Sequence, residues 1–360
     1  MIGAVQLGLL AACIVLFVPM GMAGWHLSRN KMLFFSCALF ITLAVGVHLF
    51  PYFPLISSLL SPSELISPPI PSFRDSCVFF LHNIMYRDDR ECEIGCKRSW
   101  DWIKTGRVAE CDFQKLRKPD ASDLLNGSWV VIAGDSQARL MAVSLLELLM
   151  GPESVGRIRS DLFKRHSDYS MVVLEIGMKL DFIWAPYVGN LTELTSLFKR
   201  NKDFPDVMVM GAGLWDMLHV SNASEYGSSL RVLRDNIFAL LPVSSNVDRD
   251  GEGLLSEPKS ARLLHLFWVG MPTLITSMLN TDAKREKMTG SMCDLYGDEL
   301  KRSRVLRRSG GPVLNLDIRL LSGLCGARCT SDGMHYDGVV YDAAVQIMLN
   351  ALLIESDQKP

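Results

Sequence analysis

The feature that most constrains the fold is an apolar strand that ends in a glycine turn and leads directly into an apolar helix. Residues 129–133 are apolar, Gly134-Asp135-Ser136 follows, and residues 140–150 continue as an apolar helical pattern. Such a run is typical of a strand that is buried on both faces of a sheet. Gly134 permits a sharp turn, and Asp135 or Ser136 can cap the helix. A serine there lies at the edge where open α/β sheets bind ligands, although this tripeptide alone is more often a capped turn without chemistry.

The rest of the chain alternates between strand-like and helix-like stretches. Further strands are expected at 171–176, 206–210, 263–269 and 313–318, and helices at 226–241, 282–308 and 339–354. Strands separated by helices predict an α/β fold, with a mainly parallel sheet between two layers of helices. The net charge of −2 over 360 residues gives no indication of a nucleic-acid partner.

Two stretches near the N-terminus, 2–25 and 32–63, contain no Asp, Glu, Lys or Arg. A helix needs about 20 apolar residues to cross a bilayer, so 2–23 and 33–50 are candidate spans. The loop 26–31 carries the only cations of this region, and the positive-inside rule places it in the cytosol. We therefore expect residues 1–50 to be a membrane anchor of two helices. A cleaved signal peptide is the alternative for the first span, but no basic region precedes it.

The segment that follows the anchor is expected to be a stem. Residues 51–72 are rich in proline and serine and carry one charged side chain. The folded domain, 73–360, would then lie in the lumen. Three sequences match the glycosylation acceptor pattern, at Asn126, Asn190 and Asn222, and agree with that location. Asn126 directly precedes the first strand and is expected to be crowded.

The cysteines also suit an oxidising lumen. Nine are present, and those outside the predicted spans are Cys77, Cys92, Cys96, Cys111, Cys293, Cys325 and Cys329. Disulfides would staple the segment before the first strand and the loop before the C-terminal motif. The two Cys-x3-Cys pairs are also compatible with a zinc site. No histidine completes a recognised spacing, so no metal is expected. Because the number is odd, at least one thiol is free or pairs with another chain, and the pairing stays open.

A second motif, Asp332-Gly333-Met334-His335, lies just before the last predicted helix. An aspartate three residues before a histidine can accept a hydrogen bond from Nδ1–H and leave Nε2 to take a proton from a serine hydroxyl. Ser136, His335 and Asp332 are thus the candidate nucleophile, base and orienting carboxylate. Either motif alone is more often structural. Together, after the first strand and before the last helix of one α/β chain, they indicate a catalytic triad.

With these motifs the chain resembles the GDSL/SGNH hydrolase fold and, within it, the polysaccharide O-acetyltransferases. That branch includes the plant trichome-birefringence-like proteins, and the chain also resembles the lumenal domain of CAS1-type sialate O-acetyltransferases and the altered-xyloglucan group of plant Golgi proteins. The resemblance rests on residues 134–139, 181–186, 211–215 and 332–335. It implies an SGNH-like three-layer α/β/α domain, preceded by transmembrane helices and held at the Golgi membrane with the catalytic part in the lumen.

The activity implied by the resemblance is O-acetylation of cell-wall polysaccharides of the xyloglucan or xylan type, through an acetyl-serine intermediate. An acetyl-ester hydrolase of the same fold and a non-catalytic partner of the acetylation machinery are the alternatives. No bound cofactor is implied; the substrate is an acetyl donor derived from acetyl-CoA, which a multi-span membrane protein would deliver. The acceptor would be a polysaccharide or an acetyl carrier.

The chain departs from the SGNH pattern in its third block, where an asparagine serves as an oxyanion donor and residues 211–216 contain none. The oxyanion would then rely on the Ser136 N–H, an N–H of Gly211 or Gly213, and the Arg139 side chain. A structural salt bridge is an equal alternative for Arg139. The residues expected at the site besides the triad are Gly134, Asp135, Arg139, Gly211, Gly213 and Trp215. For Trp184 and Trp215, core packing is favoured over stacking on sugar rings, and His82, His166, His219 and His265 receive no role.

Overall fold

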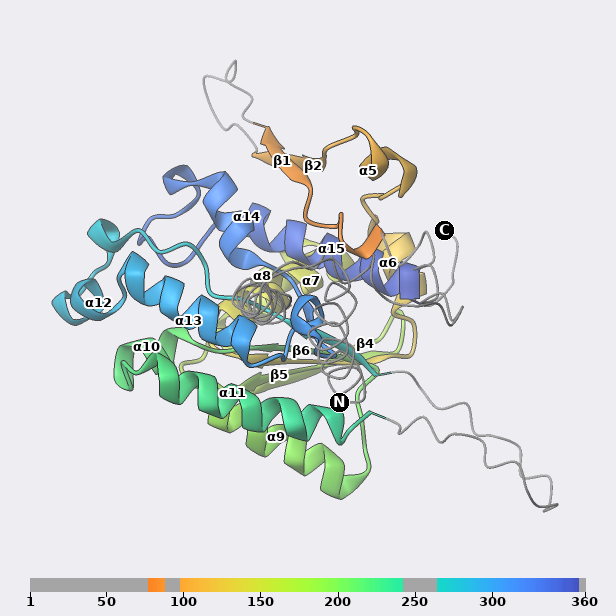
Figure 1. Ribbon diagram of the computed structural model, residues 1–360. Helices are drawn as coiled ribbons and strands as arrows, with labels where there is room; N and C mark the ends of the chain where they lie inside the picture. The colour runs from red at the N-terminus through yellow and green to blue at the C-terminus, as the bar shows by residue number, and fades with distance from the viewer. Residues whose placement is uncertain (1–76, 88–97, 242–263, 356–360) are drawn as a thin grey trace, which may run out of the picture. The chain divides into compact units, whose positions relative to one another are not determined.

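A six-stranded sheet in the order β4-β5-β3-β6-β7-β8 forms the centre of the fold (Figure 1). The computed structural model describes residues 77–87, 98–241 and 264–355; the expected anchor, the stem, Cys92 and Cys96 lie outside these residues. The strands are β3 (Trp129–Gly134), β4 (Tyr169–Val173), β5 (Met178–Trp184), β6 (Val207–Gly211), β7 (His265–Trp268) and β8 (Leu314–Asn315). All neighbours are parallel except β4, which pairs antiparallel with β5 at one edge. The α/β class with a mainly parallel sheet is confirmed.

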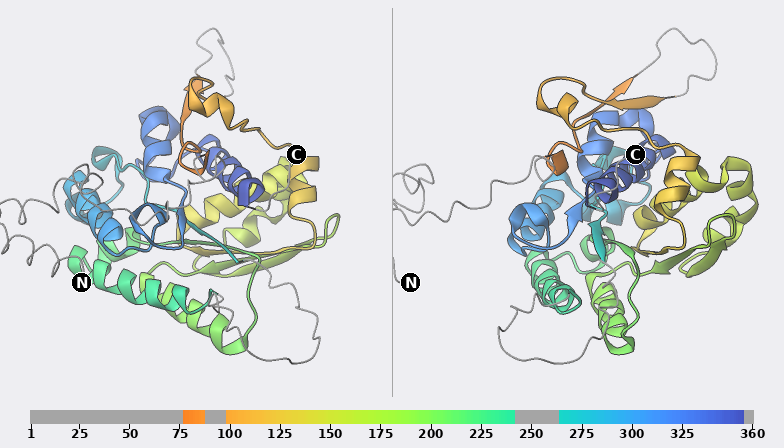
Figure 2. Two further views of the ribbon diagram at one scale, coloured as in Figure 1. Left: turned by 45° about the vertical axis from the view of Figure 1, so that its right-hand side comes forward. Right: turned by 90° about the vertical axis from the view of Figure 1, so that its right-hand side faces the viewer.

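Helices cover both faces of this sheet, as the two views of Figure 2 show. One layer contains α6 (Lys118–Leu124), α7 (Ser136–Met150), α8 (Pro152–Leu162), α14 (Ile318–Cys325) and α15 (Gly338–Glu355). The other contains α9 (Val188–Asn201), α10 (Leu214–His219), α11 (Ala223–Phe238), α12 (Asp282–Lys287) and α13 (Gly290–Arg302). A hairpin of β1 (Ile84–Arg87) and β2 (Ser99–Trp102), followed by α5 (Arg107–Glu110), lies against the first layer.

The central strand β3 is apolar because it lies between two cores. Val130 and Ile132 pack in one hydrophobic cluster and Val131 and Ala133 in the other, and all four are fully buried. Successive side chains of a strand point to opposite faces, so a strand covered on both sides needs apolar residues at every position. The position of Ser136, directly after this strand, is therefore fixed by the two largest blocks of packing in the domain.

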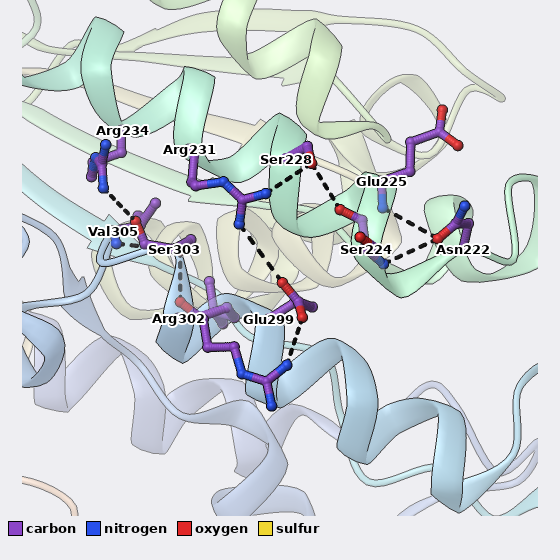
Figure 3. Close-up of polar contacts among 11 residues, drawn as sticks. Asn222, Ser224, Glu225, Ser228, Arg231, Arg234, Glu299, Arg302, Ser303 and Val305 are labelled. Atoms are coloured by element: carbon purple, nitrogen blue, oxygen red, sulfur yellow. Dashed lines mark hydrogen bonds and ion pairs between the residues drawn. The ribbon is translucent and has the colours of Figure 1, made fainter.

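The two helices α11 and α13 are joined by a polar network (Figure 3). Glu299 accepts a hydrogen bond from Arg302 at 2.8 Å and lies 3.8 Å from the Arg231 guanidinium. Arg234 donates to the Ser303 carbonyl at 3.1 Å. Gly227 permits this approach, since a Cβ there would lie 2.1 Å from Glu299 Oε2. These contacts fix the layer that carries α10 and α12, which both reach the site described below.

The structure corrects several expected boundaries. The edge strand is β4, at 169–173 rather than 171–176, and the following segment forms β5, which the sequence had not suggested as a strand. The expected helix at 282–308 is divided into α12, α13 and a 3₁₀ turn. The expected strand at 313–318 is only the two residues of β8, and α14 begins at once, with Asp317 accepting from the Leu320 N–H at 3.1 Å.

Cysteine pairing follows the expected positions. Cys77 bonds to Cys111 before the first strand of the main sheet, and Cys325 bonds to Cys329 before the C-terminal motif. Cys293 is buried and free. The sulfurs of Cys325 and Cys329 are joined to each other in this disulfide and are not free thiolates. Within the described ranges, no group of three or more His, Cys, Asp or Glu side chains is arranged to hold a metal ion.

The last helix, α15, is long and apolar enough to span a membrane by length and composition. It is nevertheless 67% buried inside the domain, where it packs beside α7 and α14 in the first hydrophobic cluster. Its apolar character is therefore explained by its place in the core.

The acceptor asparagines differ in exposure. Asn126 is exposed in the turn before β3, so the crowding expected there was wrong. Asn190 is half-buried and Asn222 is exposed, and their side-chain oxygens accept backbone hydrogen bonds at the starts of α9 and α11. Their amide nitrogens donate to no described residue, so all three keep the atom that would carry a glycan free of such a bond.

Candidate active site

Ser136 is the first residue of α7 and follows β3 through a tight turn. Asp135 is the helix N-cap, and its side chain accepts from the Gln137 N–H at 2.9 Å. Gly134 cannot carry a side chain, because a Cβ would lie 2.4 Å from the carbonyl oxygen of Gly211 on the neighbouring strand β6. The close approach of these two strand ends thus requires the glycine that precedes Asp135-Ser136.

The structure brings Ser136, His335 and Asp332 into one chain of hydrogen bonds. His335 Nε2 lies 2.8 Å from Ser136 Oγ, and His335 Nδ1 lies 2.6 Å from Asp332 Oδ2. The other carboxylate oxygen, Asp332 Oδ1, accepts from the backbone N–H groups of His335 at 2.7 Å and Met334 at 2.9 Å. Asp332 therefore holds both the imidazole and the backbone that carries it.

The loop that bears His335 is fixed by contacts with Ile275 and with Gln137. Gly333 has a φ of +75° and lies so close to Ile275 that a Cβ would be 2.5 Å from the Ile275 carbonyl oxygen. Buried Gln137 donates to the Met334 carbonyl at 3.2 Å and accepts from the Tyr341 hydroxyl on α15. Residue 137 therefore ties the serine helix to the histidine loop.

Electrostatics keep Asp332 ionised at neutral pH. Burial alone would raise the pKa of its carboxyl, but hydrogen bonds from the His335 backbone and ring and from the Met334 N–H outweigh burial and hold that pKa below its ordinary value. An ionised carboxylate favours the Nδ1–H tautomer of His335, which leaves Nε2 as the proton acceptor facing Ser136.

The carboxyls of Asp135 and Asp216, in contrast to that of Asp332, have raised pKa values. Burial raises the pKa of Asp135 to about 7, with a further contribution from the charge of Asp216. Burial likewise raises the pKa of Asp216 to about 6, and the Asp216 Oδ2 atom is buried without a hydrogen-bond partner in the described part of the chain. Asp135 caps α7 beside the serine turn, and neither side chain lines the pocket.

The serine and histidine open into a pocket of about 230 Å³. Its lining residues are Ser136, Trp184, Leu214, Trp215, Leu218, Lys284, Met288, Met334 and His335. The walls are apolar and aromatic, and Lys284 is the one cation among them apart from the titratable histidine. A small apolar pocket with a few convergent polar groups is the usual form of a binding site for a small group.

Comparison with known proteins places the chain in a family. No family model matches it. Protein ALTERED XYLOGLUCAN 9 of Arabidopsis thaliana is 52% identical over 373 residues, which cover 99% of this chain and 100% of that protein. The chain belongs to the ALTERED XYLOGLUCAN 9 family. The altered-xyloglucan group expected from the sequence motifs is thereby confirmed.

Solved structures of lower similarity include two catalytic mutants of Axe2, an acetylxylan esterase from Geobacillus stearothermophilus. They have TM-scores of 0.35 and 0.34, with 13% sequence identity in both cases. The alignments cover 66% and 68% of this chain and 96% and 98% of the esterase chains.

Of the other residues expected at the site of this family member, only Trp215 lines the pocket. Gly134 allows the end of β3 to approach β6, Gly211 allows the end of β6 to approach Val269 after β7, and Gly213, with a φ of +135°, precedes the first turn of α10. The Ser136 N–H donates to no acceptor among the described residues, as the role of an oxyanion donor requires. Asp135 is the helix cap described above.

Arg139 lies differently from either expectation. It is buried, and its guanidinium lies 4.9 Å from the ring centroids of both Phe182 and Trp184, with one donated hydrogen bond to the Ser167 carbonyl at 3.4 Å. It lines no part of the pocket and forms no salt bridge with a described residue. Its contact with Trp184, which does line the pocket, makes it a support for that wall.

Sequence reasoning missed the pocket residues that come from distant helices. Lys284 and Met288 belong to α12 and the residue after it, more than 140 positions from Ser136, and no motif marks them. Leu214 and Leu218 are spaced by one helical turn on α10, a signal that could have been found. Trp184, for which core packing was favoured, lies in the pocket wall.

Proposed function

We propose that this protein is an O-acetyltransferase that moves acetyl groups onto hydroxyls of a cell-wall polysaccharide of the xyloglucan or xylan type, through an acetyl-Ser136 intermediate. One observation carries the proposal: the hydrogen-bonded series Ser136–His335–Asp332 opens into an apolar pocket in a member of the ALTERED XYLOGLUCAN 9 family. A serine hydroxyl becomes a nucleophile only when a base accepts its proton, and the 2.8 Å contact with His335 Nε2 supplies that base.

In the acylation step, Ser136 Oγ attacks the carbonyl carbon of the acetyl donor while its proton passes to His335 Nε2. The imidazolium that forms is stabilised by Asp332, which keeps its negative charge. When the tetrahedral intermediate collapses, the bond from the acetyl carbon to the donor's leaving group breaks, and His335 returns the proton to that leaving group. The donor would be derived from acetyl-CoA and need not be held as a bound cofactor.

In the second step, an acceptor hydroxyl in the pocket gives its proton to His335 and attacks the acetyl-Ser136 carbonyl. The ester to Ser136 breaks, the serine oxygen regains the proton, and the acetylated sugar leaves. Water as the acceptor would give hydrolysis by the same steps. Transfer therefore requires a pocket that holds a sugar hydroxyl in place of water. The apolar walls of this pocket favour transfer, because they offer water few hydrogen bonds.

The oxyanion of each intermediate needs donors that are already in place. The Ser136 N–H, free at the start of α7, is one, and the positive end of that helix acts in the same direction. We assign a second donor to the backbone N–H of Gly213 or Gly211, and no part of this role to Arg139, whose guanidinium faces the aromatic rings.

The setting we propose is the Golgi lumen, with residues 1–50 as a membrane anchor and 51–72 as a stem. A multi-span membrane protein would deliver the acetyl group to the lumenal domain. Two disulfides among the described residues and three accessible acceptor asparagines support a lumenal environment.

The proposal is tested by separating transfer from hydrolysis. The purified full-length chain in detergent is given p-nitrophenyl acetate and a deacetylated xyloglucan heptasaccharide, with Ser136→Ala and His335→Ala as controls. We expect acetylated heptasaccharide by mass spectrometry, and no product with either control. Free acetate without acetylated sugar would favour the hydrolase, and no turnover of any kind would favour a non-catalytic role.

A further inference from the structure

A cluster of five aromatic rings extends from the pocket to solvent. Trp184 and Trp215 line the pocket with ring centroids 5.6 Å apart and planes at 86°, so that they form a corner. His166 stacks on Trp184 at 4.9 Å and meets Trp215 edge-on at 5.2 Å. His219 lies against Trp215 at 5.2 Å, and Tyr187 stands 6.0 Å from the same ring. Both histidines are exposed, so the cluster continues past the mouth of the pocket.

The two pocket tryptophans differ from three tryptophans whose indole groups are paired inside the domain, and from Trp268, whose Nε1 is buried without a partner among the described residues. The indole N–H groups of Trp100, Trp102 and Trp129 each donate a hydrogen bond within the domain, to Asp342, to the Leu81 carbonyl and to Asp181. Neither Trp184 nor Trp215 donates one to any described residue, and neither indole nitrogen is buried. Both therefore contribute ring surface to the pocket lining and carry an indole N–H without a partner among the described residues, which is the combination that makes tryptophan useful at binding sites.

These rings are held in position before any ligand binds. Trp184 ends β5. Its backbone N–H donates to Asp168 Oδ1 at 2.8 Å, and the Arg139 guanidinium lies 4.9 Å from its ring. Trp215 lies in the first turn of α10, directly after the glycine turn that ends β6. Because both rings are fixed by the sheet edge, little side-chain freedom is lost when a ligand stacks on them.

We infer that Trp184 and Trp215 form the subsite for the acceptor pyranose ring, an inference that rests on the proposed function and names where its acceptor binds. A pyranose has two C–H faces and a rim of hydroxyls. One C–H face of the sugar can stack on an indole ring. One rim hydroxyl can accept a hydrogen bond from a free indole N–H, while a second rim hydroxyl faces His335 Nε2. The apolar residues Leu214, Leu218 and Met288 offer no competing hydrogen bonds to these hydroxyls.

The size of the pocket agrees with one sugar ring. At about 230 Å³ it is smaller than the roughly 300–1,000 Å³ of sites that enclose drug-sized ligands. The neighbouring sugar units of a polymer would therefore lie outside it, over the exposed rings of His166 and His219. This arrangement suits a backbone or side-chain residue within a polysaccharide.

Binding is measured on the full-length chain carrying Ser136→Ala, so that no acetyl chemistry contributes. Isothermal titration calorimetry with the deacetylated xyloglucan heptasaccharide gives the Kd. We expect binding by the Ser136→Ala chain, an affinity at least about tenfold weaker when Trp215→Ala is added, and a smaller loss with Trp215→Phe, which keeps a ring face. His219→Ala, an exposed position that should not disturb folding, is expected to weaken binding by about two- to fivefold.

The matched control is Phe204→Ala, which removes a partly exposed aromatic ring just before β6, at the opposite end of that strand from the pocket. It should leave the Kd within about twofold, because no ligand contact is lost. The inference is overturned if the Ser136→Ala chain does not bind the heptasaccharide, or if Trp215→Ala and His219→Ala both bind as the control does. Because the readout is binding alone, absence of acetyl transfer in the unsubstituted chain would refute the proposed function without deciding this result.

Discussion

Replacing Asp332 by asparagine separates the two tasks of this side chain. Oδ1 accepts from the backbone N–H groups of Met334 and His335, and Oδ2 accepts from His335 Nδ1 at 2.6 Å. Asparagine keeps one oxygen for the backbone contacts, so the loop retains its shape. The second position becomes an NH₂ group, which can only donate to Nδ1. The imidazole then adopts the other tautomer, with its proton on Nε2 facing Ser136.

The expected loss follows from this geometry. A protonated Nε2 cannot accept the Ser136 proton, and the imidazolium loses its carboxylate partner. In a serine protease the same substitution lowers kcat by about 10⁴-fold, which corresponds to about 5 kcal/mol of transition-state stabilisation. We expect Asp332→Asn to lower kcat by about 10³- to 10⁴-fold, with the free energy of unfolding changed by only about 1 kcal/mol because the neutral amide still satisfies the loop.

The assay is acetyl transfer from p-nitrophenyl acetate, with KM determined separately and folding followed by urea denaturation. Asp332→Ala is the matched comparison, since it removes both oxygens and should lower stability as well as kcat. An Asp332→Asn chain that keeps kcat within tenfold of the unsubstituted protein would show that His335 is not oriented by this carboxylate, and would refute the assignment.

Three further substitutions test the support of the site. Gln137→Leu should destabilise the fold by about 1–3 kcal/mol in urea denaturation, because the buried Tyr341 hydroxyl loses its acceptor; a change below about 0.5 kcal/mol would contradict the network. The pKa of Asp135 is about 7 in the folded state and near 4 in the unfolded chain. As the pH rises from about 4 to about 7, only the unfolded chain loses this proton, so the free energy of unfolding should fall by roughly 1 kcal/mol per pH unit. Asp135→Asn, which keeps the cap, should remove this slope, and an unchanged pH profile would argue against it. Arg139→Met should change stability by only about 1 kcal/mol, since the lost contact with Trp184 is offset by relief of a buried charge; a loss above about 3 kcal/mol would indicate a stronger ionic role.

The parts of the fold that could be predicted are those in which neighbouring residues carry the signal. β3 is apolar at every position because it is covered on both faces, and the turn to α7 needs a glycine that the sequence displays. β5 was missed because Lys179 and Asp181, paired at 2.8 Å on one face, alternate with buried Met178, Leu180 and Phe182. That alternation is itself a strand pattern, so the sequence did carry a signal for β5.

In the candidate site, too, the residues that could be predicted are those marked by a local sequence pattern. Ser136, Asp332 and His335 are marked by short motifs, and the structure places them within hydrogen-bond distance of one another. Arg139 has the spacing of a site residue, yet its guanidinium turns toward Phe182 and Trp184 of β5. Lys284 and the other distant walls of the pocket depend on how α12 packs, and no local pattern encodes that.

The most direct measurement is the mass of the peptide that contains Ser136 after the full-length chain is mixed with acetyl donor and quenched in acid. We expect a population heavier by one acetyl group, about 42 Da, on Ser136, formed slowly in Asp332→Asn and absent from Ser136→Ala. Acetyl transfer to the heptasaccharide without any adduct on Ser136, or with the adduct on another residue, would contradict the account.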